Sequence, residues 1–343
     1  MSARTTHATA TSTTTATATA TATTTATAAA TATASSPTTG LDLVDVSIRI
    51  PLPGTPRRWV YPARDITLSF PAGAITAIVG ESGCGKSVLA LAATGLLPAS
   101  SQTSGSILAD GVDVLGATER ELAAIRGRAV GLVPQSAATH LTPVRTIGST
   151  LAESLAFHGL PAAAADVIDL LRSVELPPDT RQRYPHEVSG GMAQRVLVAL
   201  TCALEPSVLV ADEPTSALDA RSAALVRERL RAQADRGAAV VLITHDLVAA
   251  RGIADRVAVM YAGQILEVGP APVVLRDPAH DYTRALLAAL PENGLVPPQG
   301  TPSSLVDPDP QVCLWHARIG VPCDGAPLRS AGVDHLAACD VVS

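Results

Sequence analysis

The octapeptide GESGCGKS, residues 80–87, combines three glycines with a lysine and two serines. It fits the pattern G-x-x-x-x-G-K followed by Ser or Thr, whose glycines let backbone amides point at phosphate oxygens. In this pattern Lys86 pairs with the β and γ phosphates, and the hydroxyl of Ser87 binds Mg²⁺. A glycine turn beside a surface lysine is the plainer alternative, but a strand precedes the motif and a helix follows it, as phosphate binding requires. The predicted contacts of this phosphate loop are Gly80, Glu81, Ser82, Gly83, Cys84, Gly85, Lys86, Ser87 and Val88.

Two neighbouring acids end the apolar run VLVADEP, residues 208–214. Asp212 would orient a water on Mg²⁺, and Glu213 would act as the general base for an attacking water. Alone, such a pair more often caps a helix beside solvent. Its occurrence together with the phosphate loop favours the catalytic interpretation.

Two further polar residues follow apolar strands. Gln135, in VGLVPQS, offers an amide oxygen to Mg²⁺ or to the water, and His245, in LITHD, offers a hydrogen bond to the γ phosphate and holds Glu213 in place. Either residue alone would usually be structural, as a solvated loop glutamine or a hydrogen-bonded histidine at a strand end. Their order along the chain favours a catalytic set of Gln135, Glu213 and His245.

The elements that must position these side chains are short strands separated by helices. The runs AITAIVG, VLVADEP and AAVVLITHD each end in residues suited to chemistry, and helical stretches such as ARSAALVRERLRAQADR lie between them. Because the carboxyl ends of parallel strands share one edge of a sheet, we predict an open, mainly parallel α/β sheet with its site along that edge. The alternating run LDLVDVSIRI begins the fold as a half-buried strand.

Composition divides the rest of the chain. Residues 1–40 are almost entirely Ala and Thr and are expected to be a disordered tail, because they cannot bury enough apolar surface to fold. A targeting peptide is disfavoured by the scarcity of basic residues, and a wrongly chosen start codon remains an alternative. Residues 41–270 form the predicted main domain, with a helical subdomain at about 138–190. Residues 271–343 form a loop-rich extension.

Charge and hydropathy limit the partners. The formal charge of −6 gives no basic field for a nucleic acid, and no long charge-free run of large apolar residues could cross a membrane. If the protein works at a membrane, another chain must span it. The five cysteines are an odd number without a secretory signal, which fits a reducing compartment better than a disulfide framework.

In order and spacing, these motifs resemble the ATP-binding cassette (ABC) family across residues 41–270. The resemblance assigns Walker A to 80–87, the Q-loop to Gln135, Walker B to 208–213 and the switch histidine to His245. It implies a P-loop NTPase fold of the RecA-like type and hydrolysis of ATP with Mg²⁺, with Ser87, Gln135 and Asp212 at the metal.

The family resemblance also explains the segment VSGGM, residues 188–192, which holds no side chain able to do chemistry alone. In this family two cassettes enclose two ATP molecules head to tail, so Ser189, Gly190 and Gly191 would grip the γ phosphate held by a partner. The D-loop SALD places Asp219 at the same interface. Without the family, an ordinary helix N-cap would be an equal interpretation of the SGG segment.

Several segments narrow the resemblance to the ATPase subunits of oligopeptide, dipeptide and nickel importers. They are TPVRTIG, YPHEVSGGMAQRV, VAVMYAGQILEVGP and DPAHDYTRALLAALP. The implied partners are a second ATPase, which the family favours as a heterodimer, two transmembrane permeases and an extracytoplasmic solute-binding protein. The implied location is the cytoplasmic face of the cell membrane. A regulatory, weakly catalytic partner in a heterodimer and an export motor are the alternatives.

Some positions depart from the family pattern. Ile50 stands where many relatives have an aromatic residue for adenine, and Trp59 or Tyr61 is a candidate replacement. Ala193 replaces a common arginine, and DYTRALL follows His280 directly where relatives have proline. The terminal extension resembles one that holds four cysteines in many relatives and an iron–sulfur cluster in some. Ile319 occupies one of those positions, so Cys313, Cys323 and Cys339 are the remaining cluster ligands, and reduced structural thiols are the favoured alternative.

Overall fold

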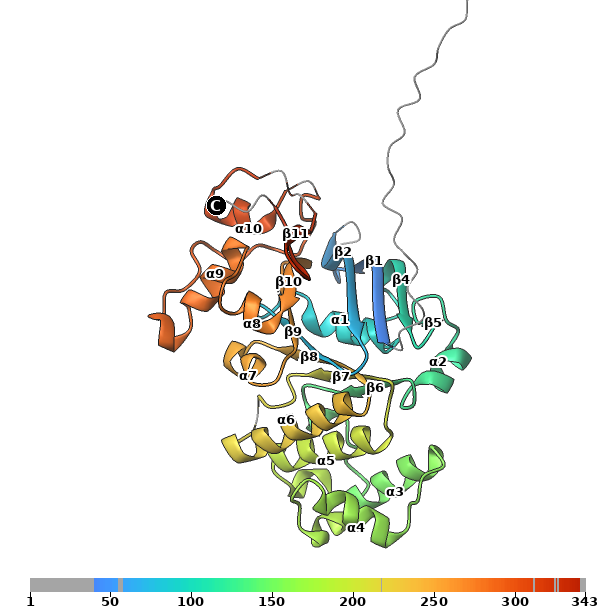
Figure 1. Cartoon of the computed structure of the whole chain (residues 1–343). Helices are drawn as coiled ribbons and strands as arrows, with labels where there is room; N and C mark the ends of the chain where they lie inside the picture. The colour runs from blue at the N-terminus through green and yellow to red at the C-terminus, as the bar shows by residue number, and fades with distance from the viewer. Residues whose placement is uncertain are drawn as a thin grey trace, which may run out of the picture. The chain divides into compact units, whose positions relative to one another are not determined.

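The computed structural model describes residues 40–54, 58–216, 218–310, 312–323, 325 and 327–339. The tail for which we predict disorder lies outside these residues, apart from Gly40, which begins the first strand. Figure 1 shows a large sheet, a smaller sheet beside it and a group of helices next to one edge of the large sheet.

The large sheet has eight strands in the order β11-β12-β10-β9-β3-β8-β7-β6, and the five strands from β9 to β6 run parallel. This confirms the predicted open, mainly parallel sheet, and the three strands with chemical residues at their ends are the neighbours β3, β8 and β7. Every residue of these three is buried, which explains their continuous apolar runs. The eight strands are β3 (Ile75–Val79), β6 (Val130–Val133), β7 (Val208–Asp212), β8 (Ala239–Thr244), β9 (Arg256–Tyr261), β10 (Gln264–Pro270), β11 (Arg329–Gly332) and β12 (His335–Ala337).

The smaller sheet is antiparallel, with the strand order β2-β1-β4-β5. Its first strand contains the alternating run predicted from the sequence, and Leu41, Leu43, Val46 and Ile48 are buried. These side chains pack in one core with Ile78 of the large sheet. The strands are β1 (Gly40–Pro51), β2 (Trp59–Pro71), β4 (Gln102–Ala109) and β5 (Val112–Asp113).

The helices begin at capped positions where the sequence provides a cap. Thr118 and Glu121 form a capping box for α2, and the side chains of Thr146 and Asp219 accept backbone N–H groups at the starts of α3 and α6. The helices are α1 (Lys86–Ala93), α2 (Glu119–Ile125), α3 (Ile147–Phe157), α4 (Ala164–Arg172), α5 (Gly190–Ala203), α6 (Ala220–Asp235), α7 (Leu247–Arg251), α8 (Ala271–Val274), α9 (Asp281–Ala288) and α10 (Leu314–Ile319).

Helices cover the region between Gln135 and Tyr184, as the sequence suggests. Helices α3, α4 and α5, the last of which begins in the SGG segment, share a core of their own, built around Ile147, Leu151 and Leu171. Figure 1 shows this group beside the β6 edge of the large sheet. The same α5 also contacts β6, so the helical group is tied directly to the strand that precedes Gln135.

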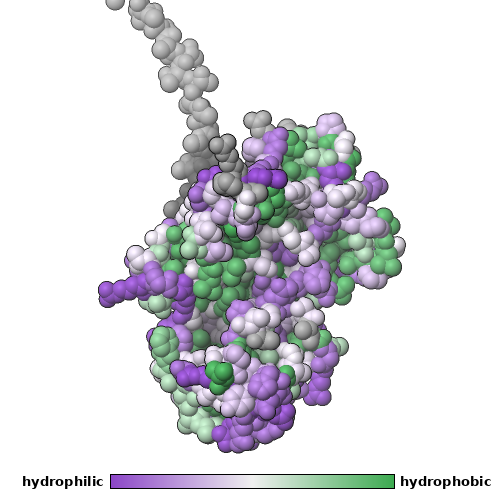
Figure 2. All heavy atoms as spheres, turned by 180° about the vertical axis from the view of Figure 1, so that it is seen from behind, coloured by the Kyte–Doolittle hydropathy of each residue, from purple (hydrophilic) through white to green (hydrophobic). Residues whose placement is uncertain are grey.

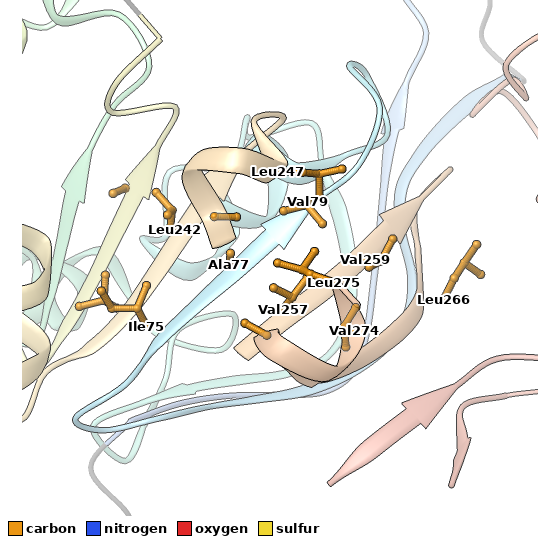
Figure 3. Packing of buried hydrophobic residues seen from close by; sticks show 14 of the residues in the cluster. Ile75, Ala77, Val79, Leu242, Leu247, Val257, Val259, Leu266, Val274 and Leu275 are labelled. Atoms are coloured by element: carbon orange, nitrogen blue, oxygen red, sulfur yellow. The ribbon is translucent and has the colours of Figure 1, made fainter. Parts of the chain in front are cut away.

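The second core lies on the opposite face of the large sheet. Ile75, Ala77 and Val79 of β3 belong to it, whereas Ile78 faces the smaller sheet, as expected from the alternation of side chains along a strand. Figure 3 shows Val274 of α8 and Leu275, which follows this helix, packed near the side chains of β9 in this core.

The C-terminal extension packs into that same core. Tyr282 of α9 and Trp315 of α10 are buried there, and their rings lie 5.1 Å apart. Strand β12 pairs with β10, so the extension also widens the large sheet. Residues 271–339, as far as they are described, therefore share their packing with the cassette.

No helix in the described part of the chain has the length and apolar character to cross a bilayer. On the face shown in Figure 2, hydrophilic and hydrophobic residues are interspersed.

Candidate functional site

A pocket of about 480 Å³ opens where the phosphate loop, β6, β7 and β8 end. Three residues predicted on separate strands, Gln135, Glu213 and His245, line it together with Lys86 and Ser87. A larger hollow of about 700 Å³ near α8 contains none of the predicted residues. The complete lining of the smaller pocket is Ile50, Val60, Pro62, Ser82, Gly83, Gly85, Lys86, Ser87, Val88, Gln135, Glu213, His245 and Leu305.

The phosphate loop curves tightly because two of its glycines lie against other backbone segments. A Cβ on Gly80 would lie 2.0 Å from the carbonyl oxygen of Met260, and one on Gly85 would lie 2.0 Å from that of Pro62. Gly85 also has a φ of 114°, in the region that favours glycine, and it directly precedes α1. The backbone of the loop thus forms a cradle for phosphate. A side chain on either glycine would clash with a neighbouring backbone segment and distort this cradle.

Lys86 is buried, and its ammonium group donates hydrogen bonds to the carbonyls of Gly80 and Glu81, each at 2.8 Å. These bonds fold the side chain back along the loop that it follows. A nucleotide phosphate in the cradle would meet an ammonium group held at the pocket wall, which is the arrangement that the motif requires.

The carboxylate of Asp212 fits a magnesium site. Its Oδ1 is buried without a hydrogen-bond partner among the described residues, and the carboxylate also bonds to the Ser87 hydroxyl. Burial is the main cause that raises the pKa of Asp212, and the Ser87 hydrogen bond opposes it. A hard cation held through Ser87 and a water would supply the partner that this oxygen lacks.

Glu213 and His245 form a close pair at the ends of β7 and β8. Nδ1 of His245 lies 2.6 Å from Oε1 of Glu213, and the backbone N–H of His245 donates to the same oxygen at 3.0 Å. Glu213 is nearly buried, whereas the side chain of His245 is 64% exposed toward the open side. The histidine therefore fixes the carboxylate while its other ring nitrogen remains available to a ligand.

Glu81 and Cys84 of the phosphate loop do not line the pocket. Cys84 is buried behind it, and burial raises the pKa of its thiol. Glu81 binds the C-terminal extension: its carboxylate accepts hydrogen bonds from Arg318 at 2.8 and 3.1 Å, and its backbone N–H donates to the Tyr282 hydroxyl at 3.0 Å. The extension thus holds the phosphate loop from outside.

The far end of the pocket is aliphatic, formed by Ile50, Val60 and Leu305. Trp59 and Tyr61, the two proposed replacements for an aromatic residue, are absent from the lining, and the Trp59 ring lies 4.6 Å from the guanidinium carbon of Arg49. A nucleobase would therefore contact branched aliphatic side chains in this chain, including one from the extension.

The residues of the SGG segment and Asp219 do not line this pocket. Ser189 is exposed and caps α5 by accepting the N–H of Met192 at 3.2 Å, and Gly190 has open space where a side chain would be. Asp219 caps α6, and the N–H of Ser222 is the main cause that lowers its pKa. Neither these residues nor Gly191 lines the pocket of the phosphate loop, so their predicted role depends on a second subunit.

Sequence reasoning missed Leu305, Tyr282 and Arg318. Leu305 reaches the pocket because residues 305–307 pair with β2: the N–H of Tyr61 donates to the Leu305 carbonyl at 2.8 Å. No local motif marks these residues, since each acts on a partner about 200 residues or more away in the chain. The three cysteines proposed as cluster ligands do converge, since Cys339 hydrogen-bonds with Cys313 and with Cys323.

Comparison with known proteins gives a consistent result. The sequence profile of the ABC transporter family matches residues 63–216. The chain is 41% identical over 258 residues to an oligopeptide transport ATP-binding protein of Lactococcus lactis subsp. cremoris, covering 73% of this chain and 75% of the relative. It is 40% identical over 272 residues to a dipeptide transport ATP-binding protein of Bacillus subtilis, covering 76% and 81%.

A third relative is longer than this chain. An oligopeptide transport ATP-binding protein of Mycobacterium tuberculosis is 37% identical over 317 residues, covering 87% of this chain but 51% of the relative. Among solved structures, a dimeric ATP-binding cassette in a post-hydrolysis state with ADP and Pi superposes with a TM-score of 0.60 at 25% identity. That match covers 67% of this chain and 98% of the solved one.

Proposed function

This chain belongs to the ABC transporter family of ATP-binding proteins, and we propose that it is the ATP-hydrolysing subunit of a peptide importer. The ATPase activity follows from the family, and the peptide cargo is proposed from the oligopeptide and dipeptide relatives. The observation that carries the proposal is the single pocket that brings Lys86, Glu213 and His245 together.

The chain's own residues suggest a division of labour in hydrolysis. The amides of the phosphate loop and Lys86 position the terminal phosphates. Glu213, held by His245, would accept a proton from the attacking water, and Gln135 lines the same pocket. Mg²⁺ held through Ser87 and Asp212 would neutralise charge on the phosphate oxygens.

A second cassette would complete the site. Ser189 and Gly190 begin α5, a helix of 14 residues, and they are exposed, so they are free to meet a nucleotide bound by another subunit. The solved relative with ADP and Pi is a dimer, which supports this arrangement. We propose a heterodimer with a related ATPase, whose signature would close the pocket of this chain.

The helical group offers a surface for permease subunits. Val144, which precedes α3, and Phe157, its last residue, are 81% and 80% exposed, so two large apolar side chains of this group are accessible to another chain. The same helical group contacts β6, the strand before Gln135, which would connect such a contact to the pocket. We place the chain at the cytoplasmic face of the cell membrane, with two permeases and an extracytoplasmic peptide-binding protein.

Lys86 provides a direct test, because it is the only lysine in the sequence. An acyl phosphate derivative of ATP, which transfers its acyl group to amines beside the phosphates, should modify Lys86 once per chain, and excess ATP should prevent this. An AMP derivative that cannot reach the phosphate loop is the matched reagent. Labelling at the N-terminal amine alone, or labelling unaffected by ATP, would contradict nucleotide binding at the cradle.

The cargo is tested separately in proteoliposomes that contain this chain, its sister ATPase and both permeases. Peptide uptake that requires ATP on the side of the ATPases and a binding protein on the other side is the expected result. Peptide movement in the opposite direction would support the export alternative. Full transport by a complex in which Lys86→Ala abolishes hydrolysis at this site would support the regulatory alternative.

A further inference from the structure

Four buried side chains in the extension turn their ligand atoms toward one another. One atom each from His280, Cys313, His316 and Cys339 lies within 4.8 Å of all the others, and each residue is at most 5% exposed. The two thiols hydrogen-bond to each other. Buried imidazoles and thiols in one cluster are the ligand types that Zn²⁺ prefers.

His316 is oriented as a metal ligand would be. Its Nε2 faces the carboxylate of Asp281 at 3.6 Å, which favours the proton on that nitrogen. Its Nδ1 is buried and has no hydrogen-bond partner in the part of the chain that the structure describes. A carboxylate behind one ring nitrogen and a free lone pair on the other is the arrangement that orients metal-binding histidines.

His280 differs from His316 in which ring nitrogen already has a partner. Its Nδ1 accepts the backbone N–H of Tyr282 at 3.0 Å, so the proton of a neutral ring lies on Nε2. The Nε2 of His280 is buried and has no hydrogen-bond partner in the described part of the chain. Because a protonated ring nitrogen cannot bind a metal ion, His280 in this tautomer leaves its place among the ligands to another group.

Cys323 is the group available for that place. Its side chain hydrogen-bonds with Cys339, and its sulfur accepts the N–H of Gly325 at 3.4 Å. A single zinc ion places tetrahedral ligands roughly 3.3–3.8 Å apart, given Zn–S and Zn–N lengths of about 2.3 and 2.0 Å. The ligand atoms of Cys313, His316 and Cys339 lie within 4.8 Å of one another, so each pair would approach by at most about 1.5 Å to bind one zinc ion. A multi-iron cluster would hold its ligands farther apart.

We propose that Cys313, His316, Cys323 and Cys339 bind one zinc ion, with His280 beside them but not as a ligand. The ion would fasten the start of α10 to the end of β12. Because α10 carries Arg318, which pairs with Glu81, the ion would also fix the residue that holds the phosphate loop from outside. His316 thus supplies the fourth ligand that a count of cysteines alone does not find.

The test uses the full chain, purified under reducing conditions with its affinity tag removed, since tag histidines bind metals. Elemental analysis should find one zinc per chain. After chelation, titration with Co²⁺ should give one equivalent of a tetrahedral cobalt spectrum with thiolate charge-transfer bands, which added Zn²⁺ abolishes. Removing the zinc should lower Tm, and adding it back should restore Tm.

Variants test the ligand assignment, with His140→Ala and Cys202→Ala as matched controls that keep one zinc per chain. His316→Ala should lose the ion, and Asp281→Asn should weaken binding about 10–100-fold, as expected for the residue behind a ligand. His280→Gln should keep one equivalent of Co²⁺. Cobalt remains measurable in any variant that refolds, so reduced stability alone does not decide the result.

Several results would overturn the proposal. Iron with acid-labile sulfide in place of zinc would show a cluster, and a Cys313–Cys339 disulfide in protein made under reducing conditions would show a redox pair. Less than about one tenth of a zinc or cobalt per chain would show that the thiols are structural. Full metal content and an unchanged cobalt spectrum in His316→Ala would remove the histidine from the site.

Discussion

Oε1 of Glu213 accepts two hydrogen bonds from one residue, from the backbone N–H of His245 at 3.0 Å and from its Nδ1 at 2.6 Å. The neighbouring strands β7 and β8 bring these residues together, and Glu213 has a φ of 47° at the turn that follows β7. A non-glycine residue in that conformation is uncommon and is maintained by its surroundings. The pair therefore fixes one carboxylate oxygen and leaves the other toward the pocket.

Replacing Glu213 with glutamine removes the base but keeps the shape of the side chain. We expect ATP hydrolysis to fall about 10²–10⁴-fold, the usual contribution of a general base, while ATP affinity changes little because Lys86 and the loop amides are intact. Single-turnover hydrolysis and equilibrium ATP binding measure the two quantities. Glu228→Gln, on the exposed face of α6, is the control. Near-normal turnover by Glu213→Gln would remove this residue from the role of base.

Two glycines of the phosphate loop allow two costs of a Gly→Ala substitution to be measured separately: the cost of a positive φ and the cost of a steric clash. Gly83 and Gly85 both have positive φ, but a Cβ on Gly83 meets nothing within 4 Å, whereas one on Gly85 lies 2.0 Å from a backbone oxygen. Gly83→Ala should cost about 1 kcal/mol of stability, the conformational term alone. Gly85→Ala should cost several times more and abolish ATP binding. Equal losses in urea denaturation would show that the contact with Pro62 does not constrain the loop.

The buried carboxylate of Asp212 should reduce the stability of the nucleotide-free protein. Burial raises its pKa in the folded state, so the folded chain keeps the proton to a higher pH than the unfolded chain does. The ionised form therefore costs stability at neutral pH, and this cost disappears as the pH falls below the unfolded pKa. Asp212→Asn should raise Tm at pH 7 by a few degrees and abolish hydrolysis, and the gain in Tm should shrink in acid.

Asp219→Asn is the matched control for that experiment, because hydrogen bonds from Ser222 lower the pKa of Asp219 in the folded state. The expected change in Tm has the opposite sign to that of Asp212→Asn. The ionised form of Asp219 stabilises the fold at neutral pH, so Asp219→Asn should have a slightly lower Tm. If both variants shift Tm in the same direction, the charge of Asp212 is not what limits stability.

The buried guanidinium of Arg318 should support nucleotide binding from a distance. Its side chain is 3% exposed, pairs with Glu81 and lies over the ring of Trp315 at 5.4 Å. Breaking a buried pair usually costs about 3–5 kcal/mol, so Arg318→Met should lower Tm clearly and weaken ATP affinity through the displaced loop. The exposed pair of Arg172 with Asp169 gives the control Arg172→Met, expected within about 0.5 kcal/mol of the wild type.

A double substitution decides how Arg318 acts. If the phosphate loop is disturbed by the unpaired charge of Glu81, then Glu81→Leu combined with Arg318→Met should regain part of the lost stability. ATP affinity that is unchanged in Arg318→Met, measured in protein that remains folded, would limit the role of this residue to packing.

The sequence predicts the phosphate loop and the strand ends because each depends on local order: a strand, a polar residue, then a turn or helix. Parallel pairing brings those ends to one edge, so Lys86, Asp212 and His245 can be placed near one another without coordinates. The predicted sheet and the helical stretches agree with the structure for the same reason. The grip of Ser189 on a partner's nucleotide stays a prediction, because it concerns a second chain.

Contacts made across the chain are invisible to motif reasoning. The Arg318–Glu81 pair spans 237 positions, and Leu305 reaches the pocket only because residues 305–307 pair with β2. A count of cysteines likewise overlooks His316, whose proposed role as a ligand depends on the carboxylate of Asp281 next to its Nε2. No spacing in the sequence distinguishes this histidine from His280. The two differ because the backbone N–H of Tyr282 occupies Nδ1 of His280, whereas Nδ1 of His316 has no such partner among the described residues.

The pairing of Leu305 with Tyr61 has a consequence for synthesis of the protein. The wall of the nucleotide pocket is finished by a segment translated some 240 residues after the strand it joins. A growing chain that has exposed only the phosphate loop and both acids still lacks that wall and the arginine behind the loop. ATP binding can therefore stabilise the complete pocket only near the end of translation. Until then, the partly synthesised domain depends on its hydrophobic cores or on a chaperone.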